Sequence, residues 1–163
     1  MILCFGGCKE SKPDTTSTKD NAVTTEPSAA PLPASTLPTD DRGRLIPLAQ
    51  KVVGFLRNKD AEALVLMAAP EGRSEMSKAL QPGGPLHEKL FAEDGWSWKA
   101  VEAWDEKVHD VRMLADEARA KYGEIDGKQA AVVLFRKVDG VWYFEGTDNP
   151  ALDAYASWGK AAE

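Results

Sequence analysis

The chain has 163 residues, which suits one domain of ordinary size. It carries 20 lysine and arginine residues against 26 aspartate and glutamate residues, so the net charge is −6. This balance excludes the basic footprint of a nucleic-acid-binding protein and a surface held to anionic lipid by charge. No apolar run reaches the roughly 18 residues that a membrane-spanning helix needs.

The composition changes sharply near residue 40. Residues 9–40 contain seven threonines, four serines and five prolines, and no aromatic residue. A segment of this kind cannot bury enough apolar surface to offset its ordering entropy. We therefore expect residues 9–40 to be a disordered linker and residues 41–163 to be the folded domain.

A short apolar segment, Met1 to Cys8, precedes this linker. Its end, Phe5-Gly6-Gly7-Cys8, resembles the lipobox of bacterial lipoproteins, whose cysteine becomes the lipid-bearing first residue of the mature protein. The resemblance implies that residues 1–8 are the remnant of a signal, that the coding region starts further upstream, and that Cys8 is the lipidation site. It places the protein in the bacterial cell envelope, with membrane contact through the lipid alone. The alternative is a cytoplasmic protein with a chance hydrophobic N-terminus.

Helices are predicted for the first half of the domain. Pro47 is tolerable only in the first turn of the first helix. Asp60 is a good N-cap, and Pro85 suits the first position of a later helix. From the helical spacing of apolar residues, the predicted helices cover residues 45–58, 61–68, 74–80 and 85–92.

After Gly95 the hydrophobic period changes toward two. Strands are predicted over residues 96–104, 108–115, 118–125, 129–138 and 141–146, with a helix through Val101 and Trp104 as the alternative for the first of them. Asp126-Gly127 and Asp139-Gly140 are two-residue hairpin signals, which place the strand 129–138 between its two sequence neighbours.

A terminal helix is expected after the last strand, with Asn149 as its cap and Pro150 in its first position. Its residues Leu152, Tyr155 and Trp158 would dock it onto the sheet. Helices followed by an antiparallel meander define the α+β class.

Two segments of the domain resemble nuclear-transport-factor-2-like domains. They are the helical turn Asn58-Lys59-Asp60-Ala61-Glu62-Ala63-Leu64 and the final hairpin from Phe135 to Phe144. In order of elements the match covers about residues 44–160. It implies a curved sheet wrapped around helices in a cone with a pocket, and a homodimer through the open sheet face. The family includes isomerases, dehydratases and ligand-binding modules, so the fold alone does not settle the activity.

Aromatic residues are the main candidates for a ligand site, because rigid aromatic walls line many pockets. The opposite interpretation is that they fill the core, which we favour for Trp142. The candidate ligand-binding residues are Trp96, Trp98, Trp104, Tyr122 and Tyr143.

The sequence offers two weak catalytic candidates. His109 stands beside Asp110, but adjacent strand residues point to opposite faces, so this carboxylate is poorly placed to orient the imidazole. Asp148 follows the last strand and could face the mouth of a cone. No motif for a cofactor is visible, and a site built on Cys4 and Cys8 lacks the further ligands that a metal needs.

Three functions therefore remain in competition. The first is a lipid-anchored envelope protein that binds a small apolar ligand or a partner protein without catalysis. The second is a small isomerase or dehydratase with His109 or Asp148 as general base. The third is a structural adaptor or spacer in the envelope. An enzyme requires a polar group of shifted pKa beside the apolar wall of its pocket, whereas a binding domain does not.

Overall fold

The computed structural model describes residues 40–93 and 96–162, apart from the side chain of Trp96. The predicted signal remnant and the predicted linker lie outside these residues, except for Asp40. The helices are α1 (Asp41–Arg57), α2 (Ala61–Met67), the short 3-10 helix η1 (Pro70–Gly72), α3 (Arg73–Leu80), α4 (Pro85–Phe91), α5 (Trp96–Glu102) and α6 (Leu152–Ser157). The strands are β1 (Asp110–Leu114), β2 (Glu117–Ile125), β3 (Gln129–Val138), β4 (Val141–Asp148) and β5 (Lys160–Ala161).

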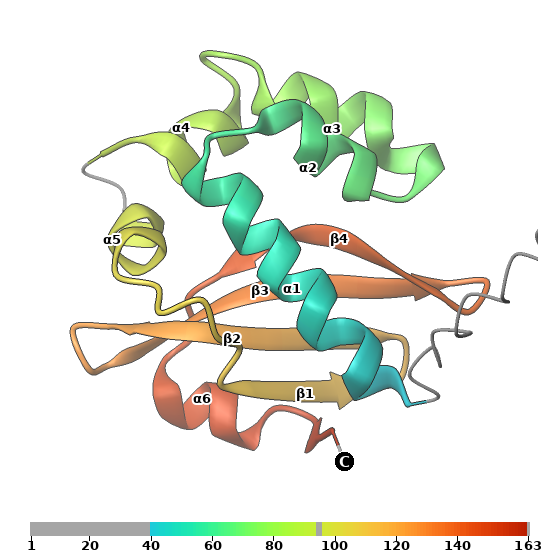
Figure 1. Ribbon diagram of the computed structural model, residues 1–163, viewed down its shortest axis with the longest axis vertical. Helices are drawn as coiled ribbons and strands as arrows, with labels where there is room; N and C mark the ends of the chain where they lie inside the picture. Colours follow the sequence, from blue (N-terminus) through green and yellow to red (C-terminus); the bar gives the residue numbers. More distant parts are fainter. Residues whose placement is uncertain (1–39, 94–95, 163) are drawn as a thin grey trace, which may run out of the picture. The chain divides into compact units, whose positions relative to one another are not determined.

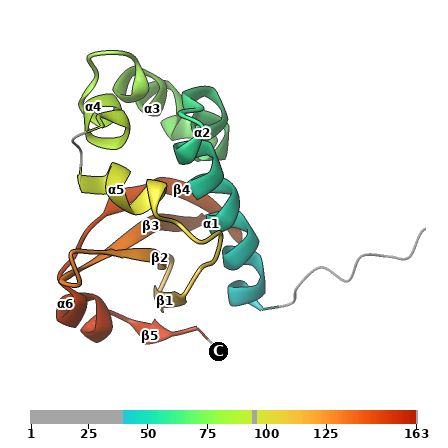
Figure 2. The ribbon, with the colours of Figure 1, turned by 60° about the vertical axis from the view of Figure 1, so that its left-hand side comes forward.

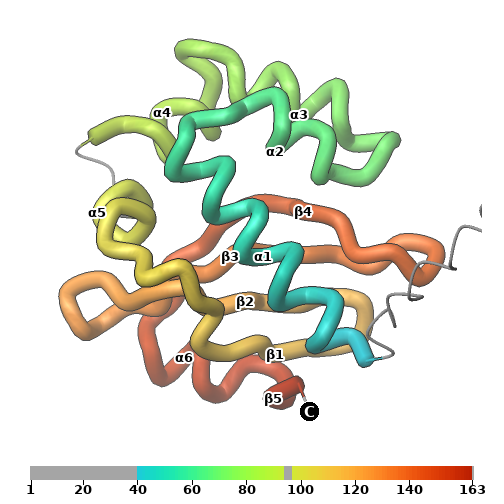
Figure 3. The backbone as a smooth tube through the Cα atoms, in the orientation of Figure 1, coloured from blue at the N-terminus to red at the C-terminus, as the bar shows by residue number. Residues whose placement is uncertain are grey.

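This order of helices followed by an antiparallel sheet confirms the predicted α+β class. Helix α1 crosses one face of the sheet, and α2, α3 and α4 lie beyond the edge formed by β4 (Figures 1 and 2). The smooth trace in Figure 3 shows how α5 returns the chain from these helices to β1.

Local sequence signals explain where three of the helices begin. The side chain of Asp60 accepts a hydrogen bond from the backbone N–H of Ala63 at 3.0 Å and so caps α2, as predicted. Pro85 occupies the first turn of α4, where its missing N–H has no helical partner to lose. Helix α1 begins earlier than predicted because Asp40 caps it, so Pro47 is its seventh residue rather than part of its first turn. Pro47 is exposed, and water can therefore hydrate the carbonyl that the proline leaves unpaired.

The predicted strand over residues 96–104 is wrong, and the helical alternative is correct for Val101 but not for Trp104, because α5 ends at Glu102. Ser97, Ala100 and Val101 are buried and follow the i, i+3, i+4 spacing of one helix face. The prediction was wrong because Trp96, Trp98 and Ala100 alternate with the polar residues Ser97 and Lys99, which resembles a strand. In the structure Ser97 is buried, so the alternation does not separate a buried face from an exposed one.

The predicted cap of the last helix is also wrong. Helix α6 begins at Leu152 with Ala151 at the N-cap position and no side-chain cap, so neither Asn149 nor Pro150 has its predicted role. The predicted docking is confirmed for Tyr155 and Leu152, which pack against one face of β3.

The sheet has the order β4-β3-β2-β1-β5, with every neighbouring pair antiparallel. The Asp139-Gly140 turn joins the paired residues Val138 and Val141, and its φ angles of 49° and 79° are those of a tight hairpin. At Asp126-Gly127 the φ angles are 51° and 63°, but Lys128 adds a third loop residue before the pair Ile125–Gln129. As predicted, β3 is central, between β2 and β4.

Both faces of β3 are covered, which explains its continuous apolar run. Ala131, Val133 and Phe135 join the main core under α1, whereas Ala130 and Val132 join a smaller cluster with Tyr155 of α6. Figure 2 shows α6 and β5 at the β1 end of the sheet, remote from α2, α3 and α4. Three helical segments therefore lie beyond the β4 edge of the sheet.

Candidate functional site

A groove of about 470 Å³ lies between the α2–η1–α3 segment and β4. Small residues create it on the helical side: Ala68, Ala69, Gly72 and Ala79 leave space that larger side chains would fill. Pro70 and Gly72 end α2 and redirect the chain through η1 into α3, which sets the angle of this wall. The volume falls within the usual range of about 300–1,000 Å³ for small-molecule sites.

The groove has an apolar floor and a charged rim. Met76 and Leu86, both half-buried, contribute the larger apolar side chains of the helical wall, and Tyr143 and Phe144 contribute those of β4. The charged lining residues are Glu71, Glu75, Arg136 and Glu145. The arrangement can hold an apolar body and orient a polar end.

One ion pair fixes the β-sheet side of the rim. The guanidinium Nη2 of Arg136 lies 2.6 Å from Oε1 of Glu145. Both side chains are about half exposed, at 56% and 42%, so the pair stabilises the fold little but holds two charges in defined positions. Glu145 sits at an irregularity in the β3–β4 register, where β4 carries an extra residue between the pairs Leu134–Gly146 and Phe135–Phe144.

The structure does not bring the five predicted ligand-binding aromatics together. Tyr143 lines the groove. Trp104 and Tyr122 are buried in the main core, and Trp98 is half-buried under the ammonium of Lys59, 4.5 Å from the ring centroid. Helix α5 begins at Trp96, whose side chain lies outside the described residues.

Several hydroxyl groups are buried in the interior of the domain. Those of Ser97, Tyr122 and Thr147 have no hydrogen-bond partner among the described residues. Burial raises the pKa of Tyr122 above its ordinary value, because the phenolate would lose its hydration. Tyr155, under α6, has a raised pKa for the same reason, and the nearby carboxylate of Asp110 raises it further.

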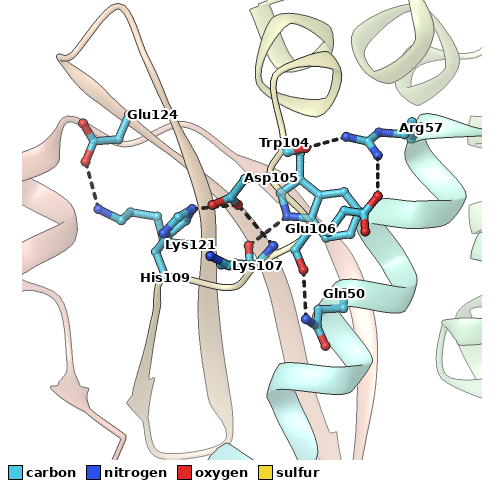
Figure 4. A network of polar contacts seen from close by, with 9 residues as sticks. All are labelled: Gln50, Arg57, Trp104, Asp105, Glu106, Lys107, His109, Lys121 and Glu124. Carbon is cyan, nitrogen blue, oxygen red and sulfur yellow. Dashed lines mark hydrogen bonds and ion pairs between the residues drawn. The ribbon is translucent and has the colours of Figure 1, made fainter.

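His109 belongs to a polar network on the loop between α5 and β1, drawn in Figure 4. Its Nε2 lies 3.2 Å from Oδ1 of Asp105, and both side chains are exposed. The expected misplacement of Asp110 is confirmed, because that carboxylate pairs with Arg112 instead. The sequence analysis did not identify Asp105 as the partner of His109. The two residues are four positions apart in a loop, and a loop has no periodic pattern from which its conformation can be predicted.

The same network attaches the loop to α1. Arg57 donates to the carbonyl of Trp104 and pairs with Glu106 at 3.3 Å, and Gln50 donates to the carbonyl of Glu106 at 2.9 Å (Figure 4). Trp104 closes the loop by donating from Nε1 to the carbonyl of Lys107 at 2.8 Å. These contacts give the residues around His109 a structural role in anchoring the chain between helices and sheet.

Neither catalytic candidate lines the groove. His109 lies in the loop network described above, and the carboxylate of Asp148 accepts a hydrogen bond from the backbone N–H of Asn149 at 2.9 Å. Within the described residues, no three histidine, cysteine, aspartate or glutamate side chains are grouped so that they could hold a metal ion. None of the described helices has the length and apolar character needed to cross a membrane.

No known protein-family model matches this chain, and no curated protein or solved structure shows significant similarity to it. The structure shows an α+β domain with an open groove beside β4, an edge strand of its sheet.

Proposed function

We propose that this chain is a lipid-anchored protein of the bacterial envelope whose domain binds a small, largely apolar ligand in the groove between α3 and β4. The observation that carries the binding role is the groove itself. It combines about 470 Å³ of space, apolar walls that include Met76 and Leu86, and a few charged groups at its rim.

The enzymatic alternative has less support from the geometry. A general base must reach the proton that it removes, within about 3 Å or through one water. The two predicted bases, His109 and Asp148, are not among the residues that line the groove. A binding role needs no such group.

Methionine methyl groups provide a direct test of binding. Three methionines lie in the described domain: Met76 lines the groove, whereas Met67 and Met113 pack against the core elsewhere. With ¹³C-methyl methionine labelling, titration with 1-hexanol should shift the NMR resonance of Met76 and leave the other two unchanged. Equal shifts of all three, or none at millimolar probe, would contradict the proposal.

A steric variant and its control sharpen this test. Ala79, half-buried on the groove wall, is changed to phenylalanine, which should abolish the Met76 response by filling the space. The matched variant Ala154→Phe places the same ring on an exposed position of α6 and should bind as the wild type does. Binding that survives Ala79→Phe would locate the ligand elsewhere.

The anchor is supported by Phe5-Gly6-Gly7-Cys8 and by the serine-, threonine- and proline-rich segment after it. Each buried methylene of an acyl chain contributes roughly 0.8 kcal/mol, so two or more chains give lasting attachment. Expressed from an upstream start in a bacterial host, the wild type should incorporate labelled fatty acid and fractionate with membranes. Cys8→Ser should do neither, and identical behaviour of the two forms would refute the anchor.

A further inference from the structure

Two carboxylates on the helical wall of the groove stand without an ion-pair partner among the described residues. Glu71 in η1 and Glu75 in the first turn of α3 are four residues apart in a continuous helical segment, and both are exposed and line the groove. Like charges at this spacing repel each other on a helix surface. The favourable interaction of each with the N-terminal end of α3 offsets part of this repulsion but leaves the charge at the rim uncompensated.

The opposite wall does not supply the missing positive charge. Arg136, the single cation among the residues that line the groove, is held 2.6 Å from Glu145. Three carboxylates against one guanidinium leave the lining with a net charge of −2. A ligand that carries a positive charge at one end therefore finds attraction at the rim, whereas an anionic ligand is repelled.

Apolar side chains line the same groove as these carboxylates. Met76, one residue after Glu75, and Leu86 from α4 present thioether and methyl groups to the same space as Glu71. A straight methylene stem can pack along such a surface while its charged end stays at the wet rim, as lysine stems do on protein surfaces. The groove thus has the shape and charge for an apolar stem with a terminal cation.

On this basis we propose that the ligand is a small aliphatic amine, bound as its ammonium ion with the methylene chain on Met76 and Leu86 and the cation between Glu71 and Glu75. The proposal rests on the binding function proposed above and names the chemical class of its ligand. The volume of about 470 Å³ fits a small molecule, which is why we assign the occupant to a free amine and not to a lysine of a partner protein.

The test compares three probes that share one chain length: hexylammonium, 1-hexanol and hexanoate, each followed by the ¹³C-methyl shift of Met76. Hexylammonium should bind about three- to tenfold more tightly than 1-hexanol, because each exposed carboxylate contributes only a fraction of a kilocalorie per mole, and hexanoate should bind least. The advantage of the ammonium should shrink as salt rises to about 0.5 M, because exposed charges are then screened within a few ångströms. Each added methylene in the amine should tighten binding about fourfold until the groove is full.

The double variant Glu71→Gln/Glu75→Gln isolates the rim charges. Hexylammonium should then bind only as tightly as 1-hexanol, while the affinity for 1-hexanol stays unchanged. The control Glu62→Gln/Glu102→Gln removes the same charge at two exposed positions outside the groove and should retain the preference for the ammonium. Unchanged methyl shifts of Met67 and Met113 will show that the variants keep the fold.

The possible failures are distinguishable. If 1-hexanol and hexylammonium bind equally well at Met76, or the glutamine variant keeps the preference, the amine assignment is overturned and the apolar binding function stands. If none of the three probes shifts Met76, both proposals fail. If the amide of Nα-acetyl-lysine binds more tightly than hexylammonium, the assignment to a small free amine is overturned in favour of a lysine side chain.

Discussion

Asp41 joins the start of α1 to the β3–β4 hairpin, and its removal should destabilise the whole domain. Its carboxylate accepts hydrogen bonds from Nζ of Lys137 at 2.9 and 3.1 Å and from Nε1 of Trp142 at 3.0 Å. Lys137 also lies over the Trp142 ring, 5.2 Å from its centroid. These contacts connect residues about a hundred positions apart in the chain, so they form only when the helical and sheet layers come together.

The expected cost of Asp41→Ala follows from three contributions. The ion pair with Lys137 is about 30% exposed and is worth about 0.5–1 kcal/mol after solvent screening. The indole N–H of Trp142, a residue only 7% exposed, loses its acceptor, which costs about 1–3 kcal/mol. The interaction of the carboxylate with the helix terminus adds about 0.3–1 kcal/mol. Because fraying of α1 lets water reach the indole, we expect a loss of about 2–3 kcal/mol, or a fall in Tm of about 8–12 °C.

Urea unfolding followed by tryptophan fluorescence measures this loss. Asp41→Asn should cost less, about 1 kcal/mol, since the amide oxygen still accepts from Trp142 while the charge is gone. The control Glu62→Ala removes a first-turn acid from α2 that has no such partners, and should cost no more than about 1 kcal/mol. A loss below about 0.5 kcal/mol for Asp41→Ala would refute the structural role.

The pH dependence gives an independent check. Hydrogen bonds from Lys137 and then from Trp142 hold the pKa of Asp41 below its ordinary value of about 4. A depressed carboxyl pKa stabilises the fold at pH values above that ordinary value, and the stabilisation is lost as the pH falls through the pKa of the folded state. The difference in unfolding free energy between wild type and Asp41→Asn should therefore be constant from pH 7 to about pH 5 and shrink below about pH 4. A difference that does not change with pH would contradict this account.

Three further substitutions test other parts of the fold by the same unfolding assay. Tyr122→Phe should leave stability unchanged or raise it by up to about 1 kcal/mol, because the buried hydroxyl has no partner among the described residues; a clear loss would reveal a contact with a buried water or ligand. Gly159→Ala should lower the free energy of unfolding by at least about 2 kcal/mol, because φ is 60° and a Cβ would lie 2.5 Å from the carbonyl oxygen of Met113. The control Gly127→Ala has a similar φ but no atom near the added Cβ, and should lower it by only about 1 kcal/mol. His109→Ala should change stability by no more than about 0.5 kcal/mol because its pair with Asp105 is exposed, and a larger loss would show that the pair anchors the loop.

Short-range signals in the sequence predict the elements whose boundaries depend on neighbouring residues. The cap at Asp60, the proline at the start of α4 and the Asp139-Gly140 hairpin each act within four residues, and each is found as predicted. The wrong strand at residues 96–104 and the wrong cap at Asn149 fall where tertiary packing decides. Two short-range signals were also misread: Pro47 lies inside α1 and not in its first turn, and the Asp126-Gly127 loop contains a third residue. Ser97 is buried with Ala100 and Val101 on one side of α5, and a serine adds no hydrophobic signal to the sequence pattern there.

The groove lies beyond sequence prediction for a geometric reason. One wall of the groove includes Ala79 on α3, and the other includes Arg136 on β3, about sixty residues later in the chain. These walls lie side by side only in the folded domain, where β4 is at an edge of the sheet. From the sequence alone, Glu71 and Glu75 are interpreted as solvent-exposed charges of no special role, because the apolar residues that line the same groove cannot be identified from the sequence.

The alternation of β4 nevertheless contained part of the answer. It predicts Trp142 and Phe144 on one face and Tyr143 and Glu145 on the other, and the burial of these four residues follows that division. A groove confined to one face would contact only one of these pairs. This groove touches Tyr143, Phe144 and Glu145 in succession, and Glu145 is the extra residue at the irregularity in the β3–β4 register. Residues from the buried set and from the outer set of β4 therefore both line the groove, and apolar and charged groups meet there. That meeting explains why one groove can offer an apolar wall and an ionic rim.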